Sequence, residues 1–188
     1  TISVHHPQIR DFIKIKRNQT RITGANVSVR LTDEFMNAVE SDSDVQLRFP
    51  VDSEAPDLVR YDSAREIWNE IVESAHASAE PGILFWDNVI NFTPSDAYSH
   101  DGFSSTSTNP CGEIILSPYD SCRLMLINLM SFVIDPFTDK AVFDFNKMGE
   151  ITQKAQRLMD DMIDLEIEQI DKIILKIERD PEPEYVKI

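Results

Sequence analysis

Apolar stretches of two different periodicities follow one another along the first half of the chain. Alternation of polar and β-branched residues is typical of strands, and apolar spacings of three and four residues are typical of helices. The predicted strands cover residues 1–4, 22–31, 45–49 and 83–86. One helix is predicted directly after Pro7, a second at 33–39 and a third at about 62–79. A turn is expected at 18–20. Strands separated by short helices favour an α/β fold with a parallel sheet, either open or closed into a barrel.

Local signals support these boundaries. Thr32 is a good N-cap for the first of the two longer helices, and Asp62 or Ser63 can cap the second. The buried stripe expected on the second helix is Ile67, Trp68, Ile71, Val72 and Ala75. The stretch 83–86 is apolar at every position, which predicts a strand buried on both faces. Small residues at 24–25 suggest that another segment approaches closely there.

The second half of the chain begins with a polar loop, 91–108, which contains Pro94 and Gly102. Long loops in compact α/β proteins are often functional. Strands are predicted after it at 113–116 and 122–129, and helical spacing of apolar residues returns at 143–164 and 167–177. The chain therefore ends in a helical segment.

The balance of charge restricts the class of partner. The chain has 33 acidic and 18 Lys or Arg residues, a net charge of -15, so its overall field repels nucleic acid and anionic membrane surfaces. No apolar run reaches the roughly 18 residues that span a bilayer, and no secretory signal opens the chain. We therefore expect a cytoplasmic protein with no membrane or nucleic-acid partner. Because the chain opens within a predicted strand and ends in charged sequence, we also expect it to be a piece of a longer protein.

The sequence predicts no metal site. Two cysteines without a CxxC pair argue against a structural zinc ion and against a disulfide-rich scaffold. His5 and His6 have no third ligand nearby, so a role at a strand end or a helix cap is favoured. The acidic cluster at 160–168 lacks Glu-x-x-His spacing and is interpreted as a solvated helical face.

The run 109–113, Asn-Pro-Cys-Gly-Glu, is the strongest candidate for chemistry. If the run is extended, Asn109, Cys111 and Glu113 point to one face, because side chains of a strand alternate. An amide, a thiol and a carboxylate would then share one small volume. The alternative for Cys111, and for Cys122, is a small apolar residue in the core.

The same run, followed by Cys122 and the apolar stretch 127–129, resembles the catalytic segment of the large chain of ribonucleotide reductases. The form Asn-Pro-Cys-Gly-Glu is most similar to the adenosylcobalamin-dependent class II enzymes. Similarity to the preceding strands and helices of that family extends over residues 1–12, 22–32 and 82–87. The chain thus resembles a central fragment of such an enzyme.

The resemblance implies an α/β fold that is about half of a ten-stranded α/β barrel, with a helical C-terminal segment. Residues 1–140 would be half-barrel strands and helices, with a finger loop around 105–116 inside the barrel. Residues 141–188 would be a helical segment and a charged tail. The fragment would be incomplete as an enzyme and inactive alone.

The resemblance also implies the roles of individual residues. Cys111 would become a thiyl radical and remove the 3'-hydrogen of a ribonucleoside di- or triphosphate. Glu113 would act as general base on the 3'-hydroxyl, and Asn109 would hydrogen-bond the ribose hydroxyls. Cys122 would be one thiol of a redox pair whose partner is absent from the chain. Adenosylcobalamin would be the cofactor, held by residues that the sequence does not identify, and an external thiol reductant such as thioredoxin would restore the pair.

Two hypotheses follow. In the first, the chain is the catalytic-core segment of a ribonucleotide reductase and works only with the remainder of its parent chain. In the second, it is a non-enzymatic acidic α/β module that self-associates or binds a protein partner. A homo-oligomer is expected in either case, because uncovered strand edges must be paired.

Overall fold

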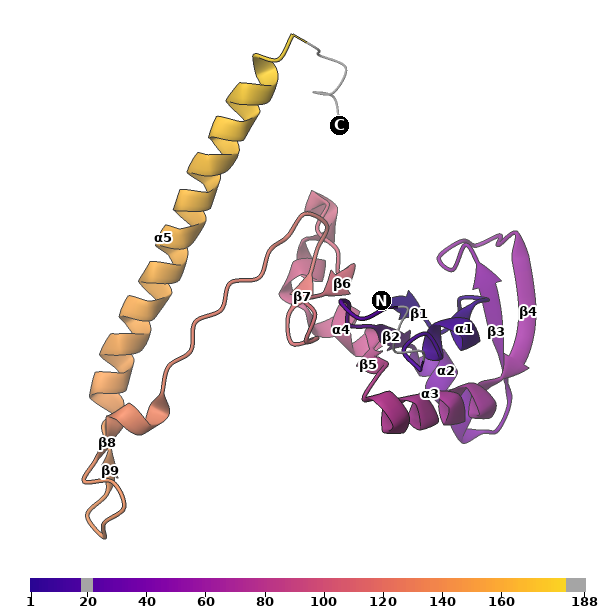
Figure 1. Cartoon of the computed structure of the whole chain (residues 1–188), viewed down its shortest axis with the longest axis horizontal. Helices are drawn as coiled ribbons and strands as arrows, with labels where there is room; N and C mark the ends of the chain where they lie inside the picture. Colours follow the sequence, from indigo (N-terminus) through magenta and orange to yellow (C-terminus); the bar gives the residue numbers. More distant parts are fainter. Residues whose placement is uncertain (18–21, 182–188) are drawn as a thin grey trace. The chain divides into compact units, whose positions relative to one another are not determined.

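The computed structural model describes residues 1–17 and 22–181, and the chain divides into two compact units (Figure 1). Unit 1 is Thr1–Cys122, and unit 2 begins at Arg123. The boundary at 140/141 that we expected between half-barrel elements and a helical segment stays a prediction. The predicted turn at 18–20 and the end of the charged tail, 182–188, lie outside the described residues.

A parallel sheet of three strands lies at the centre of unit 1 (Figure 1). Its strands are β1 (Ile2–Ser3), β2 (Ser28–Leu31) and β5 (Gly82–Phe85), in the order β1-β2-β5. Both pairings are parallel, and Val29 has Ile2 and Ile83 as its neighbours. For these three strands, the parallel α/β arrangement predicted from the sequence is confirmed.

Three helices pack against the face of this sheet that carries Val29 and Leu31. They are α1 (Ile9–Ile13), α2 (Asp33–Glu40) and α3 (Ala64–Ser78). The predicted caps are confirmed, because the Thr32 hydroxyl accepts from the Phe35 N–H at 3.1 Å and the Ser63 hydroxyl accepts from the Glu66 N–H at 3.3 Å. The core that they share contains Val4, Ile9, Ile13, Val29, Leu31, Phe35, Val39, Val45, Leu47, Ile67 and Ile71.

The buried stripe of α3 differs from the predicted one, in which Trp68 and Ala75 are only partly buried. Ile67 and Ile71 are buried, but Val72 is 49% exposed. The buried position after Ile71 is Ser74, whose hydroxyl accepts from Arg17 Nε at 2.9 Å. Steps of four and three residues keep a helix on one face, and Val72 lies about 100° away from that face.

The third predicted strand does not join the parallel sheet. It is β3 (Asp44–Phe49), and it pairs antiparallel with β4 (Leu58–Ser63) in a separate hairpin. We did not predict β4, because the polar connection 51–57 contains Pro56 and the first four residues of β4 are exposed. The prediction of four parallel strands was therefore wrong at this point.

Strand β5 is an open edge and not a strand buried on both faces. Among the described strands only β2 pairs with it, and its Phe85 side chain is 46% exposed. Trp86, which we placed in this strand, begins helix α4 (Trp86–Phe92) instead. Strand β2 is also shorter than predicted, since it begins at Ser28 and the described residues 22–27 are not in a strand.

His5 connects the sheet to the β3–β4 hairpin and to α2, which agrees with a strand-end role. Its ring is buried, and Nδ1 lies 2.9 Å from the Gln46 carbonyl oxygen. Because a carbonyl only accepts, Nδ1 carries the proton and Nε2 accepts from the Thr32 hydroxyl at 2.7 Å. Burial lowers the pKa of His5, partly opposed by the Gln46 hydrogen bond and by Glu34. The neutral ring is therefore the form that the fold stabilises.

This arrangement makes stability depend on pH. The unfolded His5 has a pKa near 6.5 and the folded one a lower pKa, so the unfolded chain binds more protons below pH 6.5. We expect the free energy of unfolding to fall as the pH drops below 6.5, by at most about 1.4 kcal/mol per pH unit from this group. Denaturant unfolding between pH 5 and 7.5 measures this slope. His5→Asn should flatten it, whereas the exposed control His76→Asn should not; equal slopes in all three proteins would contradict the assignment.

A cluster of ion pairs joins α1 to the start of α3. Arg10 makes a bidentate pair with Asp62 at 2.9 and 2.8 Å and also contacts Glu66 at 2.9 Å and Glu70 at 2.6 Å. The Arg10 hydrogen bonds lower the pKa of Asp62. This cluster links α1 to α3 and to the residue that precedes the Ser63 cap.

Unit 2 is built around one long helix. A short helical turn, η2 (Leu129–Phe132), leads into the β8 (Val133–Ile134) and β9 (Val142–Phe143) hairpin and then into α5 (Phe145–Glu178). The two predicted helical segments are thus one continuous helix. The predicted strand at 122–129 is wrong. Residues 121–128 form no strand, and no described strand forms a ladder with them.

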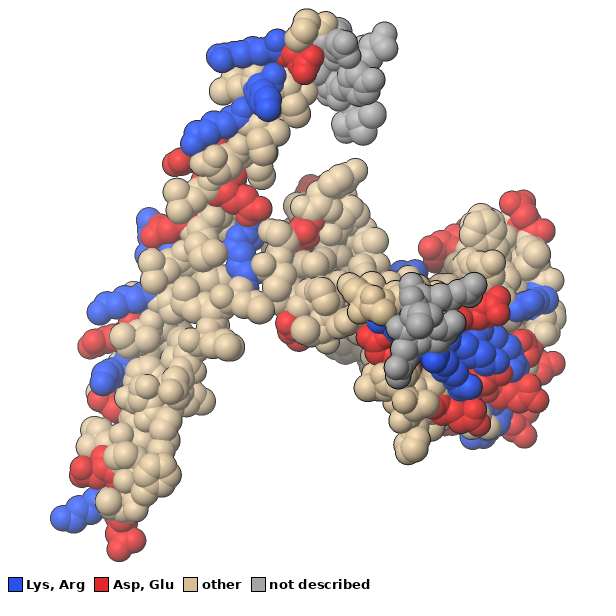
Figure 2. All heavy atoms as spheres, viewed as in Figure 1, with Lys and Arg blue, Asp and Glu red and all other residues tan. Residues whose placement is uncertain are grey.

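Helix α5 is amphipathic but has no buried residue within its unit. Its charged side chains gather along one side, and uncharged side chains cover another (Figure 2). Exposed apolar side chains on it include Leu158, Met162, Leu165, Ile170 and Ile173. Among the described residues, no helix is long and apolar enough to cross a bilayer.

Candidate active site

The run 109–113 lies at the tip of a hairpin formed by β6 (Ser107–Thr108) and β7 (Ile115–Leu116). Beyond the strands, Asn109 and Ile114 continue the pairing, with the Asn109 N–H donating to the Ile114 carbonyl at 3.1 Å. The Asn109 side-chain oxygen accepts from the Ile114 N–H at 3.1 Å. The Gly112 N–H donates to the Asn109 carbonyl at 3.1 Å, which closes a turn.

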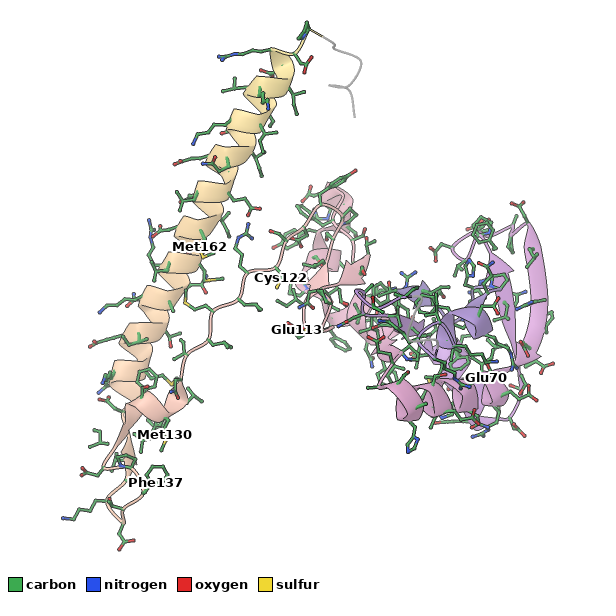
Figure 3. All side chains as sticks on the ribbon, in the orientation of Figure 1. Glu70, Glu113, Cys122, Met130, Phe137 and Met162 are labelled. Atoms are coloured by element: carbon green, nitrogen blue, oxygen red, sulfur yellow. The ribbon has the colours of Figure 1, made fainter. Side chains whose placement is uncertain are left out.

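This turn corrects the expectation of an extended run. Gly112 has φ of +86°, a conformation that glycine adopts without strain, and it reverses the chain between Asn109 and Ile114. Side chains 109, 111 and 113 therefore do not alternate as in a strand. Asn109 is 8% exposed and stabilises the turn, whereas Cys111 is exposed at the tip. Glu113 is also exposed (Figure 3), and no described contact joins the three side chains directly.

The hairpin tip lies against the sheet face opposite the helices. Leu84 and Arg30 are register partners on this face, since Val29 and Leu31 point to the core. A Cβ at Gly112 would lie 3.9 Å from the Leu84 side chain. The Asn26 side-chain nitrogen donates to the Pro110 carbonyl at 2.8 Å. One face of the sheet thus supports the core and the other supports the candidate site.

A polar hollow of about 340 Å³ lies between the hairpin and the residues that precede β2. This volume is within the range of small-ligand sites. Hydroxyl and amide groups that line it come from both sides of the hollow. The lining residues are Thr1, Gly24, Ala25, Asn26, Ser28, Ser107, Thr108, Asn109 and Pro110.

Sequence reasoning identified only Asn109 among the polar groups that line this hollow. Small residues at 24–25 gave the one available signal of a close approach, but nothing lies within 4 Å of a Cβ built at Gly24. The neighbouring Asn26 makes the contact instead. Its partner is 84 residues away in the chain, which no local pattern reveals.

Cys122 lies at the end of unit 1, after the turn that the Asp120 N–H and the Ser117 carbonyl close at 3.2 Å. It is partly exposed (Figure 3), and both Cys111 and Cys122 are free thiols. Among residues 1–17 and 22–181, no three His, Cys, Asp or Glu side chains are placed to hold a metal ion. The candidate side chains on the hairpin tip are the Asn109 amide, the Cys111 thiol and the Glu113 carboxylate.

Comparison with known proteins identifies the family. A model of the ribonucleotide reductase barrel domain matches residues 1–180. The chain belongs to this family. Within unit 1, the described β1-β2-β5 sheet carries helices on one face and does not close into a barrel, which is consistent with part of such a fold.

Curated relatives in this family are vitamin B12-dependent reductases. The chain is 35% identical over 92% of its length to a vitamin B12-dependent ribonucleoside-diphosphate reductase of Thermoplasma acidophilum. It is 33% identical over 87% of its length to the enzyme of the same name from Mycobacterium tuberculosis. It is 28% identical over 85% of its length to a vitamin B12-dependent ribonucleotide reductase of Streptomyces clavuligerus. The chain spans only 22% of the first two relatives and 18% of the third.

Proposed function

We propose that this chain is the catalytic-core segment of a vitamin B12-dependent ribonucleotide reductase, and that a longer parent chain carries the complete activity. The observation that carries the proposal is the hairpin tip: it presents a free, exposed Cys111 on the sheet face opposite the helices. That face is the interior of the barrel if the sheet is about half of a ten-stranded barrel. The hairpin is then the finger loop.

The proposed reaction is the one that the family resemblance implies for the groups at the tip. A thiyl radical at Cys111 removes the 3'-hydrogen of the ribonucleotide and becomes a thiol again. Glu113 accepts the proton of the 3'-hydroxyl as general base. The 2'-hydroxyl leaves as water, and two thiols, Cys122 and a partner in the parent chain, supply the two electrons and end as a disulfide. Cys111 then returns the hydrogen atom to C3'.

In this scheme, one hydrogen-bonding group of the Asn109 side chain is available to the substrate. Its side-chain oxygen is used by the Ile114 N–H, so its side-chain nitrogen is the group that donates to a ribose hydroxyl. Asn109 lines the hollow beside the hairpin, together with Thr108 and Ser28. This hollow is where we place the sugar of the substrate.

The radical source would be adenosylcobalamin, which supplies the oxidising radical when it is bound. An exposed thiol at a hairpin tip fits such a source, because the group must reach the sulfur from outside the hairpin. The described residues do not single out the side chains that would hold the cofactor. A thiyl radical must also be shielded from water. Because Cys111 is exposed in this chain, the remainder of the parent chain must cover it.

An activity assay tests this proposal. The parent reductase should convert a ribonucleoside diphosphate or triphosphate to the deoxy product only when adenosylcobalamin and a dithiol reductant such as reduced thioredoxin are added. The 188-residue chain should give no product under the same conditions. A parent chain that binds nucleotide but gives no cobalamin-dependent product would instead support the non-enzymatic module. Turnover by the 188-residue chain alone would contradict the assignment of an incomplete catalytic core.

A further inference from the structure

A single side-chain hydrogen bond joins the hairpin tip to the sheet within the described part of the chain. Asn26 Nδ2 donates to the Pro110 carbonyl oxygen at 2.8 Å, across a sequence separation of 84 residues. The other hydrogen bonds of the tip, from Gly112 to Asn109 and between Asn109 and Ile114, lie within the hairpin. They set the shape of the turn but not its direction relative to the sheet.

The Asn26 contact acts on the peptide unit that leads into Cys111. The Pro110 carbonyl oxygen and the Cys111 Cα belong to one planar group. A donor that fixes this oxygen therefore fixes the plane, and with it the direction in which the thiol side chain leaves the backbone. We infer that Asn26 is a positioning residue for Cys111, acting through the Pro110 carbonyl.

Asn26 is itself held by the sheet. The next residue, Val27, is buried, and its carbonyl accepts from the Gly82 N–H at 2.9 Å. Strand β2 begins immediately afterwards at Ser28. The donor is thus carried by two paired strands, β2 and β5, and its position is much less free than that of a side chain on an isolated loop.

This inference rests on the proposed function, because positioning matters only if Cys111 reacts. A displacement of about 1 Å can reduce the rate of a reaction about 10²-fold when the reacting atoms must lie in close alignment. Hydrogen transfer from C3' to a sulfur on a hairpin tip has this requirement. Loss of the Asn26 donor should therefore slow turnover and leave substrate affinity nearly unchanged.

Asn26→Asp in the parent reductase tests the inference. The change keeps the shape of the side chain but replaces the donor with a carboxylate, which the Pro110 oxygen repels. We expect kcat to fall about 10²-fold with KM within about twofold of the parent value. Asn37→Asp, which adds the same charge at an exposed position of α2, should retain the parental kcat. Asn26→Gln, which keeps a donor, should retain more activity than Asn26→Asp.

Several outcomes would overturn the inference. An unchanged kcat would show that the contact does not position the thiol. A raised KM with normal kcat would assign Asn26 to substrate binding. If Asn26→Asp melted more than about 2 °C below Asn37→Asp, the lower kcat would be a consequence of lost stability and not of a displaced thiol.

A second measurement on the 188-residue chain separates this inference from the proposed function. The Cys111 amide nitrogen shares its peptide unit with the Pro110 oxygen, so its NMR resonance reports on the hydrogen bond. The Cys111 resonance should move in Asn26→Asp and stay in place in Asn37→Asp. An unmoved resonance in both variants would refute the contact whatever the parent chain catalyses. A parent chain without reductase activity but with the shifted resonance would refute only the proposed function.

Discussion

Replacement of Cys111 by serine in the parent reductase is expected to abolish deoxyribonucleotide formation, by more than about 10⁴-fold in kcat. The O–H bond of serine is stronger than the S–H bond of cysteine. A hydroxyl in the same place therefore does not form the radical that removes the C3' hydrogen. The side chain is exposed at the hairpin tip, and its substitution by an isosteric residue leaves the Asn109–Ile114 pairing and the Gly112 turn intact. Nucleotide binding should therefore remain close to that of the parent, as measured by equilibrium dialysis.

Cys122→Ser is the matched control for this variant. It removes the other thiol of the chain, which we assign to the reduction of C2' and not to hydrogen abstraction. Multiple turnover should be lost, but the first step should survive. If Cys111→Ser kept measurable turnover, the radical assignment would be wrong; if it lost nucleotide binding as well, the fold around the tip would be affected instead.

Replacement of Phe35 by alanine is expected to have the largest effect on stability. Its ring is fully buried in the core shared by α2, α3 and the sheet, and its removal leaves a cavity that rigid neighbours cannot fill. Such changes cost about 3–5 kcal/mol. Phe92→Ala, at a side chain that is 82% exposed, should stay within about 0.5 kcal/mol of the parent.

Denaturant unfolding followed by tryptophan fluorescence measures both variants, because Trp68 packs against the same core. A Phe35→Ala protein with a midpoint equal to that of Phe92→Ala would contradict the core described for unit 1. Loss of stability at Phe35 would also affect the site, since the sheet that carries this core on one face carries the hairpin on the other.

The parts of unit 1 that could be predicted depend on local chemistry. Helices α2 and α3 begin where Thr32 and Ser63 can cap them, and their apolar spacing selects the buried side. Strands β1, β2 and β5 follow from short apolar runs separated by helices. These signals lie within a few residues of each other, so a single sequence contains them.

The parts that could not be predicted depend on distant partners. The apolar stretch 122–129 has the composition of a strand, but a strand needs a neighbour to accept its hydrogen bonds, and none of the described strands pairs with it. Strand β5 is apolar throughout and yet partly exposed. Its reason is also a missing partner, since β2 is the one described strand that pairs with it. Both stretches have the composition of barrel strands in a chain that spans 22% of its first relatives.

The geometry that we predicted for the candidate site was wrong, and the roles of its residues stay a prediction. The sequence identified Asn109, Cys111 and Glu113, and it placed them in a strand because alternate positions of a strand share a face. A turn closed by Gly112 replaces that strand, and the side-chain oxygen of the buried Asn109 accepts a hydrogen bond within the turn. The contact from Asn26 and the hollow beside it depend on residues that the fold brings together across more than 80 positions.

The central claim is that the Cys111 sulfur takes the hydrogen from C3' of a ribonucleotide. A substrate that carries tritium at C3' tests it directly, in the parent reductase with adenosylcobalamin and over a single turnover. The parent protein should return most of the tritium to C3'. Cys122→Ser cannot complete the reduction and should lose tritium from C3' to solvent, because the tritium on the Cys111 thiol exchanges with water, and Cys111→Ser should release none. Tritium release by Cys111→Ser at the rate of Cys122→Ser would contradict the account.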